Sequence, residues 1–99
     1  MRFVFINNKM SLSTLNVIDP RFESIRYDKK TKKVAIVDIA VIITGYQSND
    51  ASKYVRAALK QLGKTLPRLK INGKGNLTPV ADVETAIQVI WKLRHLVLR

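Results

Sequence analysis

The 99-residue sequence contains no cysteine, one histidine and one tryptophan. Without cysteine, the chain can form no disulfide, hold no metal through thiolates and use no cysteine nucleophile. The single histidine, His95, excludes any site that needs two. Only 7% of the residues are aromatic, and no expected strand carries the aromatic pair of an RNA-recognition sheet. We therefore expect neither a metal nor a cofactor.

Acidic residues are also scarce, with 7 Asp and Glu against 18 Lys and Arg, for a net charge of +11. Such an excess predicts a polyanionic partner, nucleic acid first and an anionic membrane surface second. The acids after residue 30 stand at or near expected helix starts, where they stabilise helices instead of gathering around a metal ion; they are Asp38, Asp50, Asp82 and Glu84. The sequence thus predicts no catalytic residues and no enzyme.

Long apolar runs are missing as well. The longest mainly apolar stretch, Val34–Ile43, is interrupted by Asp38, whereas a membrane span needs about 20 residues. Near the N-terminus, Met1–Ile6 is followed by two asparagines and a lysine, where a signal peptide would continue its apolar core. We expect an intracellular protein that is not secreted and that meets DNA in a nucleus, nucleoid or viral factory.

The pattern along the chain predicts an N-terminal arm, residues 1–21, and a single domain, residues 22–99. Within the arm, Arg2–Asn7 is a candidate edge strand, and Asp19 followed by Pro20 marks a break. The arm either packs on the domain or moves separately from it.

A first hairpin is expected at the start of the domain. Phe22–Tyr27 alternates apolar and polar residues, which predicts a half-buried strand. Asp28–Lys32 is a polar turn and Lys33–Ile36 the return strand, so the hairpin has a basic tip.

Two helices joined by a polar turn follow this hairpin. The β-branched residues of Val37–Thr44 would also suit a strand, but Gly45 resembles a helix C-terminal residue. Favourable N-cap types then precede the helix Ala51–Leu62, which Gly63 can end; these are Ser48, Asn49 and Asp50. Two helices around a short glycine-containing turn are typical of a helix-turn-helix.

A second hairpin and a last helix complete the expected α+β, winged-helix-like fold. Leu66–Ile71 and Leu77–Val80 are its strands, and Asn72–Asn76 is its glycine-rich turn. This turn is either a plain hairpin turn or the tip of a wing that touches DNA. Asp82 caps the closing helix, in which Trp91 is expected to anchor the core.

The helix Ala51–Leu62 carries a basic face that suits the major groove of DNA, although a solvated amphipathic helix would look similar. Arg56 is the best candidate for reading bases, because only arginine offers a rigid bidentate fork. Lys53, Lys60 and Lys64 suit phosphates. The predicted nucleic-acid-binding residues are Gln47, Asn49, Lys53, Arg56, Lys60, Lys64, Arg68, Lys70, Lys74, Lys30, Lys32 and Lys33.

Five segments together are similar to a known family. The run Val34–Thr44, followed by Asp50–Arg56 and Leu59-Lys60, resembles the KilA-N and Bro-N type DNA-binding domains of bacteriophages and large DNA viruses. In those domains a strand leads into a helix with an Asp near its start, and a polar turn then leads to a helix with aromatic and basic residues. The segments Leu69–Gly75 and Thr78–Val80 resemble the hairpin that follows.

The resemblance covers about residues 22–93. It implies DNA binding, a viral or phage origin and a role in transcription or genome handling, and it lends weight to Lys53, Arg56 and Lys60. We expect the chain to depart from the family in its long apolar arm and in the absence of an attached catalytic domain.

Double-stranded DNA is therefore the expected partner, and RNA is the first alternative, because clustered cations serve both polymers. The second alternative is a protein- or membrane-interaction module that uses the apolar arm and the tail Leu96–Leu98. A homodimer through the arm or the C-terminal helix is compatible with DNA binding and would favour palindromic targets.

Overall fold

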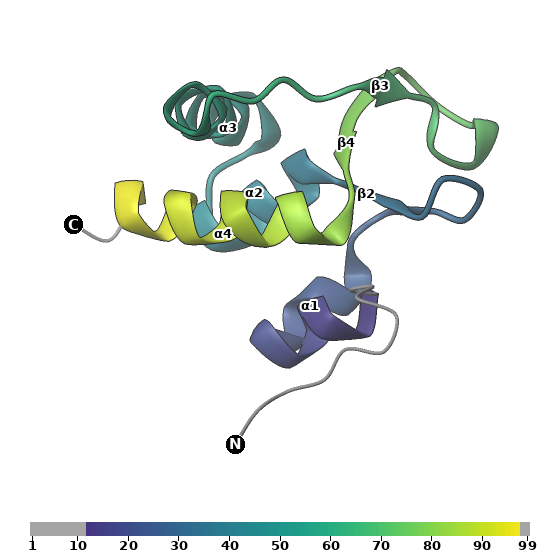
Figure 1. Ribbon diagram of the computed structural model, residues 1–99, viewed down its shortest axis with the longest axis horizontal. Helices are drawn as coiled ribbons and strands as arrows, with labels where there is room; N and C mark the ends of the chain where they lie inside the picture. The colour runs from purple at the N-terminus through teal and green to yellow at the C-terminus, as the bar shows by residue number, and fades with distance from the viewer. Residues whose placement is uncertain (1–11, 98–99) are drawn as a thin grey trace.

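The structure, a computed structural model, describes residues 12–97. Within that range it is an α+β fold with four α-helices and four strands (Figure 1), so the expected class is confirmed. The helices are α1 (Leu12–Ile18), α2 (Ile36–Thr44), α3 (Ser48–Leu62) and α4 (Val83–Val97). The strands are β1 (Tyr27–Asp28), β2 (Lys33–Ala35), β3 (Arg68–Leu69) and β4 (Thr78–Ala81). The candidate edge strand Arg2–Asn7 lies outside the described residues.

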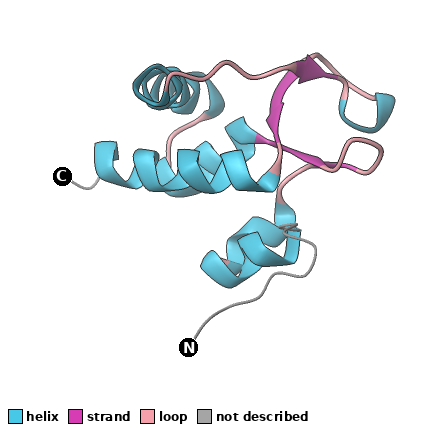
Figure 2. Cartoon of the chain, viewed as in Figure 1, coloured by secondary structure: helices cyan, strands magenta, loops and turns pink. Residues whose placement is uncertain are grey.

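The strands form one antiparallel sheet in the order β1-β2-β4-β3 (Figure 2). Both expected hairpins are present, and β2 and β4 join them at the centre of the sheet. Val34 of β2 pairs with Tyr27 of β1 on one side and with Ala81 of β4 on the other. The two basic hairpins are therefore parts of a single unit.

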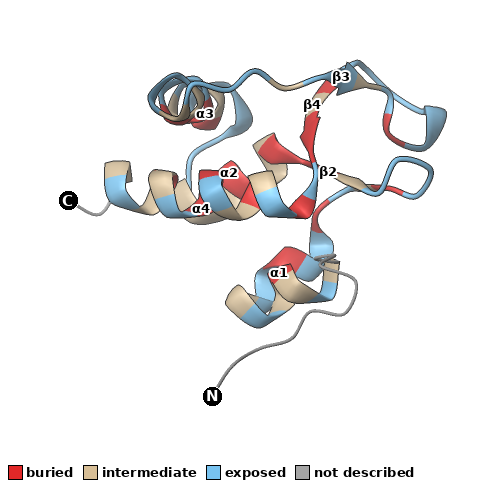
Figure 3. Cartoon of the chain, in the orientation of Figure 1, coloured by how far each residue is buried: buried red, intermediate tan, exposed pale blue. Residues whose placement is uncertain are grey.

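The core follows the two-residue period of the central strands. Val34 and Ala81 face the helices and join the main core, which also includes Ile39 of α2 and Ile90 of α4. Their neighbours Ala35 and Val80 face the opposite side of the sheet, where Ile71 covers them in a second, small cluster. Figure 3 shows the buried positions where the elements face one another and mostly exposed ones at the hairpin tips.

The helix α1 was not expected from the sequence. The ends of the other helices follow the predicted signals, except at the start of α3. Gly45 and Gly63 end α2 and α3 with φ of 74° and 67°, a region in which a side chain is disfavoured. Asp82 caps α4, because its Oδ1 accepts a 2.8 Å hydrogen bond from the backbone N–H of Thr85. In α3 the N-cap is Gln47, with no side-chain cap hydrogen bond, so the expected cap residues Ser48–Asp50 form the first turn.

The strand expected over Phe22–Tyr27 is wrong except at its end. The segment Pro20–Ser24 is instead a 3-10 helix, η1. Asp19 initiates it by accepting a 2.9 Å hydrogen bond from the N–H of Arg21, and proline suits the first helical position. Phe22 and Ile25 are both buried. Their spacing of three residues matches the three-residue turn of a 3-10 helix, whereas in a strand these two positions would face opposite sides.

The strand expected over Leu66–Ile71 is shorter than predicted, since β3 holds only Arg68 and Leu69. A second 3-10 turn, η2 (Ile71–Gly73), takes over at the point where Asn72 adopts φ of 53°.

The part of the arm that the structure describes packs on the domain. Leu15 of α1 is fully buried and belongs to the main core. Across residues 12–97, none of the helices combines the length and apolar character needed to cross a membrane.

Candidate nucleic-acid interface

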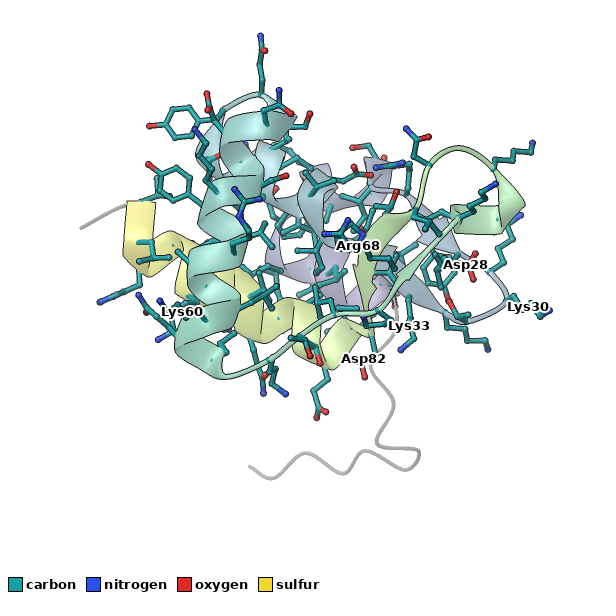
Figure 4. All side chains as sticks on the ribbon, turned by 90° about the horizontal axis from the view of Figure 1, so that it is seen from above. Asp28, Lys30, Lys33, Lys60, Arg68 and Asp82 are labelled. Carbon is teal, nitrogen blue, oxygen red and sulfur yellow. The ribbon has the colours of Figure 1, made fainter. Side chains whose placement is uncertain are left out.

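A groove of about 750 Å³ lies between α3 and the segment that leads from α3 to the sheet. We call it the α3 groove. Five of the predicted binding residues line it, namely Asn49, Arg56, Lys60, Lys64 and Arg68. Figure 4 looks down on this face, with Lys60 on α3 and Arg68 across from that helix, toward the sheet. The helix, the linker and β3 thus bring together residues up to 19 positions apart in the sequence.

The α3 groove has an excess of positive charge. Four cationic side chains and no Asp or Glu line it. Among the described residues, Arg56, Lys60 and Arg68 form no ion pair, in contrast to Lys53, whose Nζ lies 3.6 Å from Asp50. Lys53 is on α3 but does not line the groove. A local field of one sign in a hollow attracts anions more strongly than the same charge spread over a convex surface.

The remaining walls of the groove are apolar or carry hydroxyls. Val37, Leu59, Leu66 and Pro79 contribute apolar surface, and Ser52 and Thr65 contribute hydroxyl groups. Neither hydroxyl was among the sequence-predicted residues. Ser52 could have been found, because it stands three residues after Asn49 and four before Arg56 and so shares their helix face. Thr65 lies in a linker whose path the sequence does not reveal.

A side pocket of about 180 Å³ adjoins this groove at Lys64 and is lined by Lys33, Asp82 and Thr85, among others. Figure 4 shows Lys33 and Asp82 close together, at the ends of the central strands β2 and β4. Hydrogen bonds with Thr85 lower the pKa of Asp82, and the charges of Lys33 and Lys64 lower it further. Asp82 is thus a carboxylate that partly offsets the positive charge at this rim.

The two hairpin tips are fastened to each other. Asn72 donates from its side-chain amide to the carbonyl of Tyr27 (3.0 Å) and accepts from the backbone N–H of Lys29 (3.0 Å). Four of the predicted lysines lie on this double tip, outside the α3 groove, and are exposed: Lys30, Lys32, Lys70 and Lys74. Figure 1 shows both tips on the same side of the molecule.

Arg26, which belongs to the basic cluster of the first hairpin, is neutralised. Its guanidinium Nε and Nη2 each lie 3.0 Å from a carboxylate oxygen of Asp38 at the start of α2. This bidentate pair raises the pKa of Arg26 and holds the chain against α2. The arginine is therefore structural, and the lysines of the tip are the free charges there.

The aromatic residues differ from expectation at one position. Tyr46 and Tyr54 stack on each other with ring centroids 5.5 Å apart. Trp91 does not anchor the core: it is 55% exposed. The buried face of α4 runs through Ala86, Val89 and Ile90, and Trp91 lies beyond its edge.

Comparison with protein-family models found no match, and searches of curated proteins and of solved structures returned no significant match. Within residues 12–97, no three His, Asp or Glu side chains gather where they could hold a metal ion.

Proposed function

We propose that the chain is a non-catalytic, winged-helix-like domain that binds double-stranded DNA through the α3 groove. The observation that carries this proposal is the convergence of Arg56, Lys60, Lys64 and Arg68 on one hollow that no carboxylate lines. Duplex DNA presents about one negative charge per 1.7 Å of its axis, so a row of cations in a hollow lined by no carboxylate matches it.

In this proposal α2 and α3 form the helix-turn-helix, and α3 enters the major groove. With 15 residues, α3 is about 22 Å long, and a helix fits the major groove of B-form DNA. Arg56 then faces the base edges, while Lys60 and Lys64 contact phosphates. The β3–β4 hairpin is the wing, with Arg68 at its base.

The hairpin tips add contacts at one flank of the site. Because Asn72 of the second hairpin is hydrogen-bonded to the first hairpin, Lys30 and Lys74 approach the DNA backbone from the same side. A role in transcription or genome handling, as in the viral and phage domains that the sequence resembles, follows from this mode of binding.

Fluorescence anisotropy tests the proposal. A labelled random duplex of 20 base pairs is titrated at two salt concentrations, beside a matched duplex RNA and a single strand. We expect tighter binding to the DNA duplex that weakens steeply with salt, and near-complete loss of binding in the triple variant Arg56→Ala, Lys60→Ala, Lys64→Ala. We expect the variant to remain folded, because all three side chains are exposed. A circular dichroism melt checks this. Retained affinity in the folded variant, or a preference for RNA, would refute the proposal.

A further inference from the structure

A second hollow, of about 610 Å³, lies between the C-terminal end of α3 and α4. We call it the Trp91 hollow. It is lined by Leu62, Lys64, Gln88, Trp91, Lys92 and His95. Lys64 lines this hollow as well as the α3 groove, so the two are neighbours around one side chain. The proposed function uses no residue of α4.

Trp91 is displayed in this hollow in an arrangement suited to stacking. The guanidinium of Arg94 lies over the indole, 5.2 Å from its centroid, in a cation–π contact. The residue is nevertheless 55% exposed, so a large part of the ring is open to solvent. A large exposed aromatic ring costs free energy in water, and one among cations matches a flat, anionic ligand such as a nucleotide.

We infer that the Trp91 hollow binds an unpaired nucleotide of a single strand that flanks the duplex, with the base stacked on Trp91. This inference rests on the proposed function. Bases within a duplex are already stacked on one another, so only an unpaired base is free to stack on the ring. A strand that leaves the α3 groove beside Lys64 meets Lys92 in the next hollow, and none of the residues lining the two hollows is acidic.

The positive charge around Trp91 argues against a second copy of this chain as the occupant. In a twofold dimer each surface meets its own copy, so Lys92, Arg94 and Lys64 would face the same cations across the interface. Such like-charge contacts oppose association. Unpaired DNA has the complementary charge and also the flat ring that the indole can stack on.

Trp91 is the only tryptophan of the chain, so its fluorescence reports on this hollow directly. The test compares a blunt 20-base-pair duplex with the same duplex carrying a four-nucleotide single-stranded overhang. We expect the overhang to quench Trp91 and to tighten binding roughly fivefold or more. In Trp91→Ala, affinity for the blunt duplex should be unchanged and the advantage of the overhang lost, whereas Trp91→Phe should keep part of it.

The outcomes separate this inference from the proposed function. Equal affinity and equal fluorescence for the two DNAs would overturn the inference and leave duplex binding intact. If neither DNA binds, both fail. A spectral shift with protein concentration alone would assign the hollow to a dimer, and a shift only with vesicles of phosphatidylcholine and phosphatidylserine would assign it to a membrane. Either result would overturn the inference.

Discussion

The carboxylate of Asp28 in β1 accepts a 2.6 Å hydrogen bond from the backbone N–H of Asn72, 44 residues further along the chain. Its other oxygen, Oδ2, accepts from both the N–H and the hydroxyl of Thr31. Asp28 is only 4% exposed. One buried carboxylate therefore closes the turn of the first hairpin and holds the second hairpin beside it, which fixes the position of the basic double tip.

Asp28→Asn should destabilise the protein at neutral pH and much less in acid. These hydrogen bonds lower the pKa of Asp28 below its ordinary value of 3.8. A lowered pKa stabilises the fold above the ordinary value, and this stabilisation is lost as the pH falls through the folded-state pKa. Asparagine offers one acceptor oxygen and brings an N–H group toward a donor, so a hydrogen bond that closes the turn is lost and stability falls.

Urea unfolding of the wild type and Asp28→Asn between pH 7 and pH 3 measures this effect. The difference in unfolding free energy should narrow toward low pH. Asp50→Asn is the matched control, because Asp50 is exposed and has only a 3.6 Å pair with Lys53. A penalty for Asp28→Asn that is independent of pH would contradict a role for its charge.

Substitutions of Asn72 should follow a fixed order of stability, with the wild type above Asn72→Gly and Asn72→Ala lowest. Glycine removes both side-chain hydrogen bonds but tolerates the φ of 53°. Alanine removes the same bonds and places a Cβ in the left-handed region, at a further cost of about 1 kcal/mol. Thermal melts give the order.

Hydrogen exchange of the Lys29 amide, which donates to the Asn72 side chain, should accelerate in both variants. Lys74→Ala is the control at the same tip, and its exposed side chain predicts a change within about 0.5 kcal/mol. If alanine proved as stable as glycine at position 72, the backbone argument would be wrong.

Lys60 and Lys53 provide a matched pair for the proposed interface. Both are exposed lysines on α3, so either alanine variant loses one charge from the same helix. Lys60 lines the α3 groove and Lys53 does not. We expect Lys60→Ala to reduce the slope of log affinity against log salt by about 0.9, the value for one phosphate contact.

Lys53→Ala should change that slope by clearly less, because its charge is outside the groove and is partly offset by Asp50. The measurement is the same anisotropy titration across a salt series. Equal losses in the two variants would show that total charge, and not the hollow, governs binding.

Local sequence signals predicted α2, α3 and α4 well, because their causes are local, whereas α1 in the arm was not predicted. Gly45 and Gly63 end helices through their own backbone freedom, and Asp82 caps α4 three residues from its hydrogen-bond donor. The strand expected over Phe22–Tyr27 was wrong, because two patterns fit these six residues. Apolar and polar residues alternate, as in a strand, but the buried Phe22 and Ile25 are three residues apart, as in a 3-10 turn. There Asp19 and Pro20, recognised only as a break, initiate a 3-10 turn.

The candidate site could be predicted only in part, since it depends on tertiary packing. The basic stripe of α3 was visible in the sequence, but the partner wall that carries Arg68 depends on how the linker returns to the sheet. Trp91 shows the same limit: the apolar stripe of α4 is wider than the surface that covers it. Only packing against α2 and α3 decides that Val89 is buried and Trp91 is not.

The shortness of the edge strands has a consequence for how the protein behaves at high concentration. β1 and β3 hold two residues each, so the sheet offers few open backbone groups on which another chain could add a strand. Lys29 and Lys30 follow one edge and Lys70 the other, and lysines at sheet edges oppose aggregation. Variants in which these lysines are replaced to test DNA contacts would also lose protection against self-association into β-structured aggregates.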